Sequence, residues 1–152
     1  RVGQFGKPFT IYKFRSMWVS APKDAATHTL QNADSHITRA GKFLRKASLD
    51  ELPQLINILK GEMSFVGPRP ALYNQHDLVK ERDKYSANNM RPGLTGWAQV
   101  NGRDELPIRL KAQLDGEYAK RVGVAMDARC LYMTVAAVLT NKGVREGEHT
   151  DE

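Results

Sequence analysis

A proline at position 53 limits how the segment SLDELPQL, residues 48–55, can fold. Ser48 and Glu51 have the spacing of a capping box, in which a serine begins a helix and a glutamate three residues later bonds back to it. A helix beginning at Ser48 would place Pro53 at its fifth position, where proline removes a hydrogen bond and crowds the previous turn. Either the helix is kinked, or it begins near Pro53 with Asp50 and Glu51 in the turn before it. Both alternatives place two acids at the positive end of a helix, which favours their ionised forms.

The adjacent carboxylates of Asp50 and Glu51 have two interpretations. The first is structural, because a capping box and the helix dipole account for both acids without any chemistry. The second is chemical, because an ionised carboxylate can act as a nucleophile and two adjacent carboxylates favour a bound Mg²⁺, which in turn binds a diphosphate. Spacing alone favours the structural interpretation.

The composition narrows the class of protein. A length of 152 residues with 41% apolar residues suits one domain with a core of its own. The net charge of +6 favours anionic partners, which include nucleic acid, an anionic membrane face and phosphorylated substrates. A single cysteine, Cys130, excludes an internal disulfide, and the four histidines have no metal-ligand spacing with it. No apolar run approaches the roughly 20 residues that a membrane span needs.

Periodicity and turn residues predict a compact α+β domain of four or five helices with a few short strands. The expected strands are 7–17, 63–66 and a short strand within 91–103. The expected helices are 36–47, 49–60, 71–90, 105–121 and 127–140, and the last of these is apolar enough to be expected in the core. A mobile loop is predicted for 18–35. The domain would cover 1–140, with a flexible charged tail at 141–152.

Several cations are candidates for phosphate binding. Arg69 lies between two prolines, whose rigid backbone suits a bidentate contact, although an ordinary rigid turn is the alternative. Lys13 and Arg15 are two residues apart in the first expected strand, so they share a face. Arg91 and Arg103 flank a glycine-rich segment that matches neither the Walker pattern nor GxGxxG.

The helix predicted at 36–47 has a basic face, which either is a solvated surface or contacts lipid or substrate phosphates; its residues are Arg39, Lys42, Arg45 and Lys46. An acidic pair, rigidly placed cations and a basic surface together fit metal-assisted phosphoryl transfer. A basic nucleic-acid-binding module is the alternative from another class. It is supported by the charge and by aromatic residues near basic ones, but it lacks a recognisable nucleic-acid motif.

Three segments, in this order, closely resemble the bacterial sugar transferase family, the monotopic phosphoglycosyl transferases: FTIYKFRSM, ITRAGKFLRKASLDELPQLINILKGEMSFVGPRP and RPGLTGWAQVNGR. The resemblance extends from residue 1 to about residue 140. It implies transfer of a sugar-1-phosphate from a UDP-sugar to undecaprenyl phosphate, with release of UMP. Such a reaction initiates the synthesis of a polysaccharide or glycoconjugate, such as an exopolysaccharide, a lipopolysaccharide or a capsule.

The resemblance also implies roles for single residues. Asp50 would attack the sugar-linked phosphate and form a covalent phosphosugar–aspartate, which divides the transfer into two steps. Glu51, together with Asp50, would hold Mg²⁺. The family's further site positions fall on residues that would bind the substrate: Lys13, Arg15, Arg69, Arg91, Arg103, Asp115 and Tyr118.

Two departures from the family pattern shape the remaining expectations. Family members begin with a hydrophobic re-entrant membrane helix and this chain begins after that segment, so we expect a truncated, soluble catalytic domain of a protein on the cytoplasmic face of the bacterial inner membrane. A domain that binds the donor without turnover is therefore a third hypothesis. The stretches YAKRVGVAMD and GRDELPIRLKAQLD differ from the corresponding stretches of many members. We expect an N-acetylated amino sugar in the donor and no nucleic-acid partner.

Overall fold

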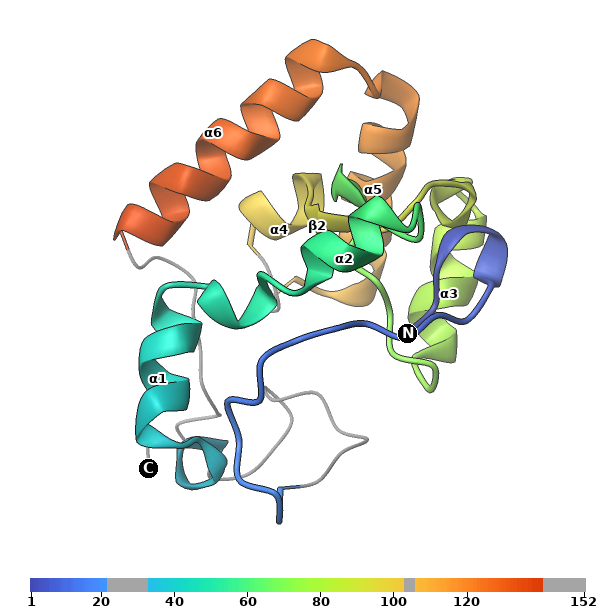
Figure 1. Ribbon diagram of the computed structural model, residues 1–152. Helices are drawn as coiled ribbons and strands as arrows, with labels where there is room; N and C mark the ends of the chain where they lie inside the picture. Colours follow the sequence, from blue (N-terminus) through green and yellow to red (C-terminus); the bar gives the residue numbers. More distant parts are fainter. Residues whose placement is uncertain (22–32, 103–105, 141–152) are drawn as a thin grey trace, which may run out of the picture.

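The computed structural model describes residues 1–21, 33–102 and 106–140 (Figure 1). Six α-helices and one two-stranded sheet lie in these ranges, so the α+β prediction is confirmed. The elements are α1 (Arg39–Lys46), α2 (Gln54–Leu59), β1 (Ser64–Val66), α3 (His76–Asp83), β2 (Gly93–Thr95), α4 (Trp97–Val100), α5 (Ile108–Arg121) and α6 (Val124–Thr140). The sequence did not predict α4, which has four residues. The predicted tail and most of the predicted loop at 18–35 lie outside the described residues.

The sheet consists of β1 and β2, which pair in parallel with Ser64 opposite Gly93 and Val66 opposite Thr95. A glycine directly after each strand, Gly67 and Gly96, lets the two chain segments come into close backbone contact. A Cβ atom on Gly67 would lie 2.5 Å from a carbonyl oxygen of the neighbouring chain segment, and one on Gly96 would lie 2.0 Å from the carbonyl oxygen of Gly67. The glycine-rich segment therefore packs against the backbone that leads into Arg69.

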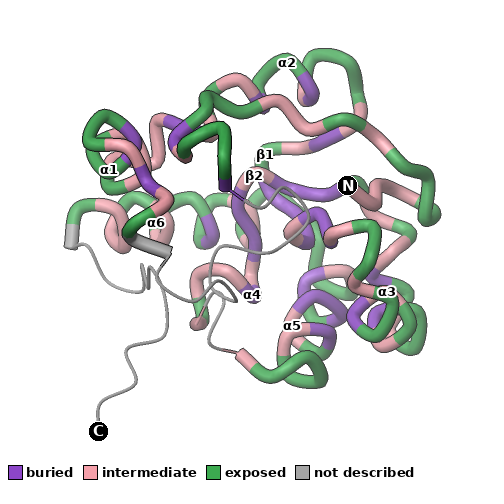
Figure 2. Tube along the Cα trace, turned by 90° about the horizontal axis from the view of Figure 1, so that it is seen from below, coloured by how far each residue is buried: buried purple, intermediate pink, exposed green. Residues whose placement is uncertain are grey.

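The core forms where β1 meets α5 and α6. Val66, Tyr118 and Cys130 make up the buried cluster, and Met90, Trp97 and Met126 pack against it. Buried stretches gather around the sheet and around α3 and α5 in Figure 2. α5 passes close to the residues after α3, because a Cβ on Gly116 would lie 2.5 Å from Cβ of Tyr85. This contact leaves no room for a side chain at position 116.

The prediction that the last helix lies in the core is wrong. α6 buries Cys130 completely, but Tyr132 is 75% exposed and Leu139 is 77% exposed. Figure 1 shows α6 running away from the rest of the molecule along much of its length. One face of α6 packs against the sheet, where the hydroxyls of Thr134 and Thr95 are 2.6 Å apart. The apolar composition of this helix therefore did not predict its burial, because burial also requires neighbouring elements along its whole length.

The prediction of a strand at 7–17 is also wrong, because this segment belongs to neither strand of the sheet. Isolated bridges join Pro8 to Val2 and Met17 to Ile37, and between them a side chain takes the place of a neighbouring strand. Asn57 of α2 accepts a hydrogen bond from the N–H of Tyr12 (3.1 Å) and donates one to the carbonyl oxygen of Thr10 (2.8 Å). The N–H of Phe14 donates to the carbonyl oxygen of Asp50 (2.9 Å). The blue segment in Figure 1 thus runs beside α2 and the turn before it.

Replacing Asn57 by alanine should destabilise the protein. Its amide is fully buried and serves two backbone groups, which the Asn57→Ala variant would leave without these partners. We expect the free energy of unfolding to fall by about 1–3 kcal/mol, measured by urea denaturation. The control is Asn89→Ala, because Asn89 is exposed. Equal stabilities of the two variants would contradict the role assigned to Asn57.

Candidate active site

The two acids lie in a short turn before α2. Leu49–Glu51 forms a single 3₁₀ turn, and α2 begins after Pro53, at Gln54. The alternative with a late helix start is therefore confirmed, and the capping box is absent. Ser48 has a left-handed backbone (φ 55°), its side chain caps nothing, and its N–H donates to the carbonyl oxygen of Arg45. The Glu51 carboxylate is thus directed to other partners.

Those partners are two of the predicted phosphate-binding cations. One carboxylate oxygen of Glu51, Oε1, lies 2.6 Å from Nζ of Lys13 and 3.3 Å from a guanidinium nitrogen of Arg69. Burial alone would raise the pKa of Glu51, but the charges of Arg69 and Lys13 and their hydrogen bonds outweigh it and lower the pKa to about 2. Glu51 is therefore ionised at every pH at which the protein would work.

Asp50 has a different environment from its neighbour. Its exposed fraction is 9%, and burial raises the pKa of its carboxyl group. The positive charge of Lys13 opposes this rise, whereas the negative charge of Glu51 adds to it. Two adjacent carboxylates at one helix start thus differ in acidity, and Asp50 is the one that a falling pH protonates first.

The number of acidic side chains limits the kind of metal site that Asp50 and Glu51 could form. The described residues contain no group of three or more His, Cys, Asp or Glu side chains that could hold a metal by itself. Mg²⁺ is commonly bound by one or two carboxylates, with waters and substrate phosphates as its other ligands. Mg²⁺ therefore stays the predicted metal for Asp50 and Glu51, with the phosphates of a bound substrate among its other ligands.

For Arg15 and Arg91, no hydrogen bond or ion pair among the described residues joins the side chain to the acidic pair. Arg15 and Arg91 are exposed, and Arg103 lies outside the described residues. The substrate-binding role of all three stays a prediction.

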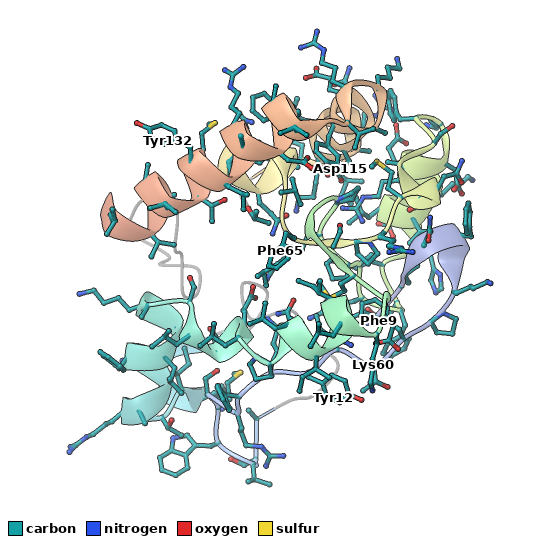
Figure 3. The ribbon with its side chains drawn as sticks, turned by 45° about the horizontal axis from the view of Figure 1, so that its top comes forward. Phe9, Tyr12, Lys60, Phe65, Asp115 and Tyr132 are labelled. Carbon is teal, nitrogen blue, oxygen red and sulfur yellow. The ribbon has the colours of Figure 1, made fainter. Side chains whose placement is uncertain are left out.

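Asp115 and Tyr118 lie on α5, and both side chains are buried. Oδ2 of Asp115 is 2.6 Å from NH2 and 2.8 Å from Nε of Arg82, and the Tyr118 hydroxyl lies 3.2 Å from the carbonyl oxygen of Val66 and 2.7 Å from a carboxylate oxygen of Asp127. Burial raises the pKa of Asp115 and of Tyr118. In Figure 3 Asp115 lies on the α5 side of the molecule, while Tyr12 and Lys60 lie beside α2. A direct substrate contact stays a prediction for both residues, and every contact described here is internal.

Two residues that support the site were missed from the sequence. Asn57 is a polar residue within the apolar pattern of α2, and that interruption was a usable signal. Arg82 lies in a polar helix with weak periodicity, so the sequence does not distinguish it from the exposed charged residues around it. Only its spacing of four residues from the buried Leu78 places it on the inner face of α3.

Large apolar side chains lie exposed on and near α2, which is unusual for a surface that faces only water. They are Leu52, Leu55, Ile56 and Leu59. Within the described residues, none of the helices combines the length and the apolar character that crossing a bilayer requires.

Known proteins are similar to this chain over almost its whole length. The model of the bacterial sugar transferase family matches residues 1–141. An uncharacterized sugar transferase, EpsL, of Bacillus subtilis is 40% identical over 98% of this chain and 72% of its own length. The UDP-glucose:undecaprenyl-phosphate glucose-1-phosphate transferase of Xanthomonas campestris is 41% identical over 93% of this chain and 31% of its own length.

A third relative comes from Aeromonas hydrophila. It is a UDP-N-acetylgalactosamine-undecaprenyl-phosphate N-acetylgalactosaminephosphotransferase, 39% identical over 95% of this chain and 35% of its own length. The chain thus spans about a third of the two relatives whose donor sugar is named. The match of the family model to residues 1–141, together with these identities, shows that the chain belongs to the bacterial sugar transferase family.

Proposed function

We propose that the protein transfers a sugar-1-phosphate from a UDP-sugar to undecaprenyl phosphate and releases UMP. The observation that carries this proposal is the acidic pair before α2, with Lys13 and Arg69 directed at Glu51. Membership of the family supports it, as do the names of the relatives from Xanthomonas campestris and Aeromonas hydrophila, both described as acting on undecaprenyl phosphate.

The proposed reaction has two steps at one phosphorus atom. A carboxylate oxygen of Asp50 attacks the phosphorus that carries the sugar, the bond from that phosphorus to the UMP oxygen breaks, and UMP leaves with the bonding electrons. An oxygen of undecaprenyl phosphate then attacks the same phosphorus and displaces the Asp50 carboxylate. One pocket can thereby serve a soluble donor and a lipid acceptor in turn. The burial of Asp50 would limit the access of water to the covalent intermediate.

Glu51, Lys13 and Arg69 would supply the charges that the diphosphate needs. In this proposal Asp50 and Glu51 hold Mg²⁺, which would neutralise the diphosphate and the departing UMP. Lys13 and Arg69 keep Glu51 ionised, and an ammonium and a guanidinium are both donors suited to phosphate oxygens.

We further propose that the protein acts at the cytoplasmic face of the bacterial inner membrane on a donor with an N-acetylated amino sugar. The exposed apolar side chains around α2 support a contact with lipid, and α1 adds exposed basic residues next to them in the sequence: Arg39, Lys42 and Lys46. The relatives include both a glucose and an N-acetylgalactosamine transferase, so their names do not choose the sugar. The nucleic-acid alternative gains no support from the comparisons, because the family and the named relatives are sugar transferases.

The Asp50→Asn variant should lose its activity. The substitution keeps the shape of the side chain and removes the nucleophilic charge, so we expect UMP release from a UDP-sugar to fall on the order of 10³-fold or more. The assay uses the intact protein in membranes, with undecaprenyl phosphate, Mg²⁺ and a panel of UDP-sugars. Asp77→Asn is the matched control, because Asp77 is an exposed acid in the first turn of α3.

Undiminished turnover by the Asp50→Asn variant would refute the proposed mechanism. If the unsubstituted protein binds a UDP-sugar in the presence of Mg²⁺ but forms no product, the donor-binding hypothesis replaces the transferase.

The Glu51→Gln variant should need more Mg²⁺. A neutral amide at position 51 would leave Lys13 and Arg69 facing no carboxylate, and it would remove one of the two proposed metal ligands. We expect the Mg²⁺ concentration for half-maximal UMP release to rise about 10-fold or more. An unchanged Mg²⁺ dependence, with Glu117→Gln as the control at an exposed glutamate, would exclude Glu51 as a metal ligand.

Removing Lys13 should move the acid limb of the pH–rate profile. Lys13 lowers the pKa of Asp50, so its loss in the Lys13→Met variant raises that pKa further. The nucleophile must be ionised, and the fall of kcat/KM on acidification should therefore begin at a higher pH than in the unsubstituted protein. The exposed Lys80 provides the control, Lys80→Met. An acid limb that stays in place, or moves to lower pH, would show that Lys13 does not act on the reacting carboxylate.

A further inference from the structure

Arg82 of α3 is a buried arginine with partners on two sides. Its side chain is 4% exposed, and its Nε and NH2 groups face Oδ2 of Asp115 on α5 at 2.8 and 2.6 Å. Its third nitrogen, NH1, donates to the backbone carbonyl oxygen of Arg69 at 2.9 Å. A buried guanidinium needs a carboxylate for its charge, but the bond to Arg69 is not required for that purpose.

The backbone leading to Arg69 is anchored at successive residues. The carbonyl oxygen of Val66 lies 3.2 Å from the Tyr118 hydroxyl, the N–H of Gly67 donates to Thr95, and the carbonyl oxygen of Pro68 accepts from Gly93. The next peptide unit joins Arg69 to a proline, which has no N–H. Its carbonyl oxygen is therefore the one group through which the backbone of that unit can be held by hydrogen bonds, and Arg82 binds it.

We propose that Arg82 is a positioning residue, which orients Arg69 toward Glu51 and the substrate phosphates; this rests on the proposed function. By fixing the carbonyl of Arg69, Arg82 sets the rotation of the backbone on which the Arg69 side chain stands. The reach of that side chain leaves little tolerance, because its guanidinium nitrogen is 3.3 Å from Oε1 of Glu51, at the long end for a hydrogen bond. We therefore expect a rotation of this backbone to weaken the contact.

The geometry requires an arginine at position 82. The planar guanidinium presents its N–H groups in a fixed fork, so that binding Asp115 by one edge directs NH1 at the Arg69 carbonyl. A lysine has one nitrogen on a flexible stem and cannot reproduce this arrangement. Asp115 thus sets the plane of Arg82, and Arg82 in turn sets the backbone of Arg69. This gives Asp115 a function in the site without any contact with substrate.

The simpler alternative is that Arg82 and Asp115 only join α3 to α5. The two explanations differ in one respect. A packing role would lower activity regardless of what stands at position 69, whereas a positioning role operates only while the guanidinium of Arg69 is present.

A double-mutant cycle with Arg82→Lys and Arg69→Ala separates them, with kcat and KM for the UDP-sugar measured on the intact protein in membranes. We expect Arg82→Lys alone to lower kcat/KM on the order of 10²-fold, as for a misplaced binding group. In the Arg69→Ala background the further loss should be less than about 2-fold, because the two substitutions remove the same interaction. Equal losses in both backgrounds would overturn the proposal. Lys84→Ala, which removes the exposed partner of Glu81 at the end of α3, should leave kcat/KM unchanged.

A second readout does not depend on activity. In the intact protein in nanodiscs, the Nε–Hε NMR signal of Arg69, identified by its loss in Arg69→Ala, should report a more mobile side chain in Arg82→Lys than in the unsubstituted protein. An unchanged order parameter would overturn the proposal. Should Arg82→Lys fail to fold, Asp115→Asn takes its place in both measurements with the same expected directions. If the unsubstituted protein releases no UMP, the proposed function fails while this readout still tests the positioning.

Discussion

The contact of one carboxylate oxygen of Glu51 with Lys13 and Arg69 is the interaction around which the site is built. It joins an extended N-terminal segment, the turn before α2 and the segment after β1. A carboxylate that is largely buried must be paired, since an isolated buried charge is very unfavourable. The requirement to pair Glu51 therefore forces two distant parts of the chain to approach the start of α2, and the rest of the fold has to make that approach possible.

The fold meets this requirement with buried polar side chains as well as with its sheet. A two-stranded sheet holds the segment that leads to Arg69, but it leaves the last peptide unit and the whole Lys13 segment without partners in the sheet. Asn57 binds the backbone of Thr10 and Tyr12, just before Lys13, and Arg82 binds the carbonyl of Arg69. In both cases a side chain on a helix does what a neighbouring strand would otherwise do. The short strands and the buried polar residues thus belong to one structural solution.

The same reason explains which features the sequence could predict. Local chemistry was sufficient for the strand at 64–66, and at Pro53 it reduced the start of α2 to two alternatives, of which the structure has the later one. It was insufficient for the 7–17 segment, whose partner is a side chain 45 residues away, and for α6, whose exposure depends on where its neighbours end. The role of Arg82 could not be predicted because it depends on Asp115 and on the carbonyl oxygen of Arg69, and neither is close to Arg82 in the sequence.

Long-range partners also separate the roles of two acids that are neighbours in the chain. Asp50 and Glu51 share one turn and one helix start, so local electrostatics treats them alike. Arg69 and Lys13 hold the pKa of Glu51 far below that of an ordinary glutamate, whereas burial raises the pKa of Asp50. Glu51 is thereby suited to a permanent negative charge, as a metal ligand needs. In the proposed mechanism Asp50 is the nucleophile, and the burial that raises its pKa is what makes its carboxylate more basic than that of Glu51. Exchanging the two residues would keep the composition of the turn and lose this difference, because Lys13 and Arg69 approach from the side of position 51.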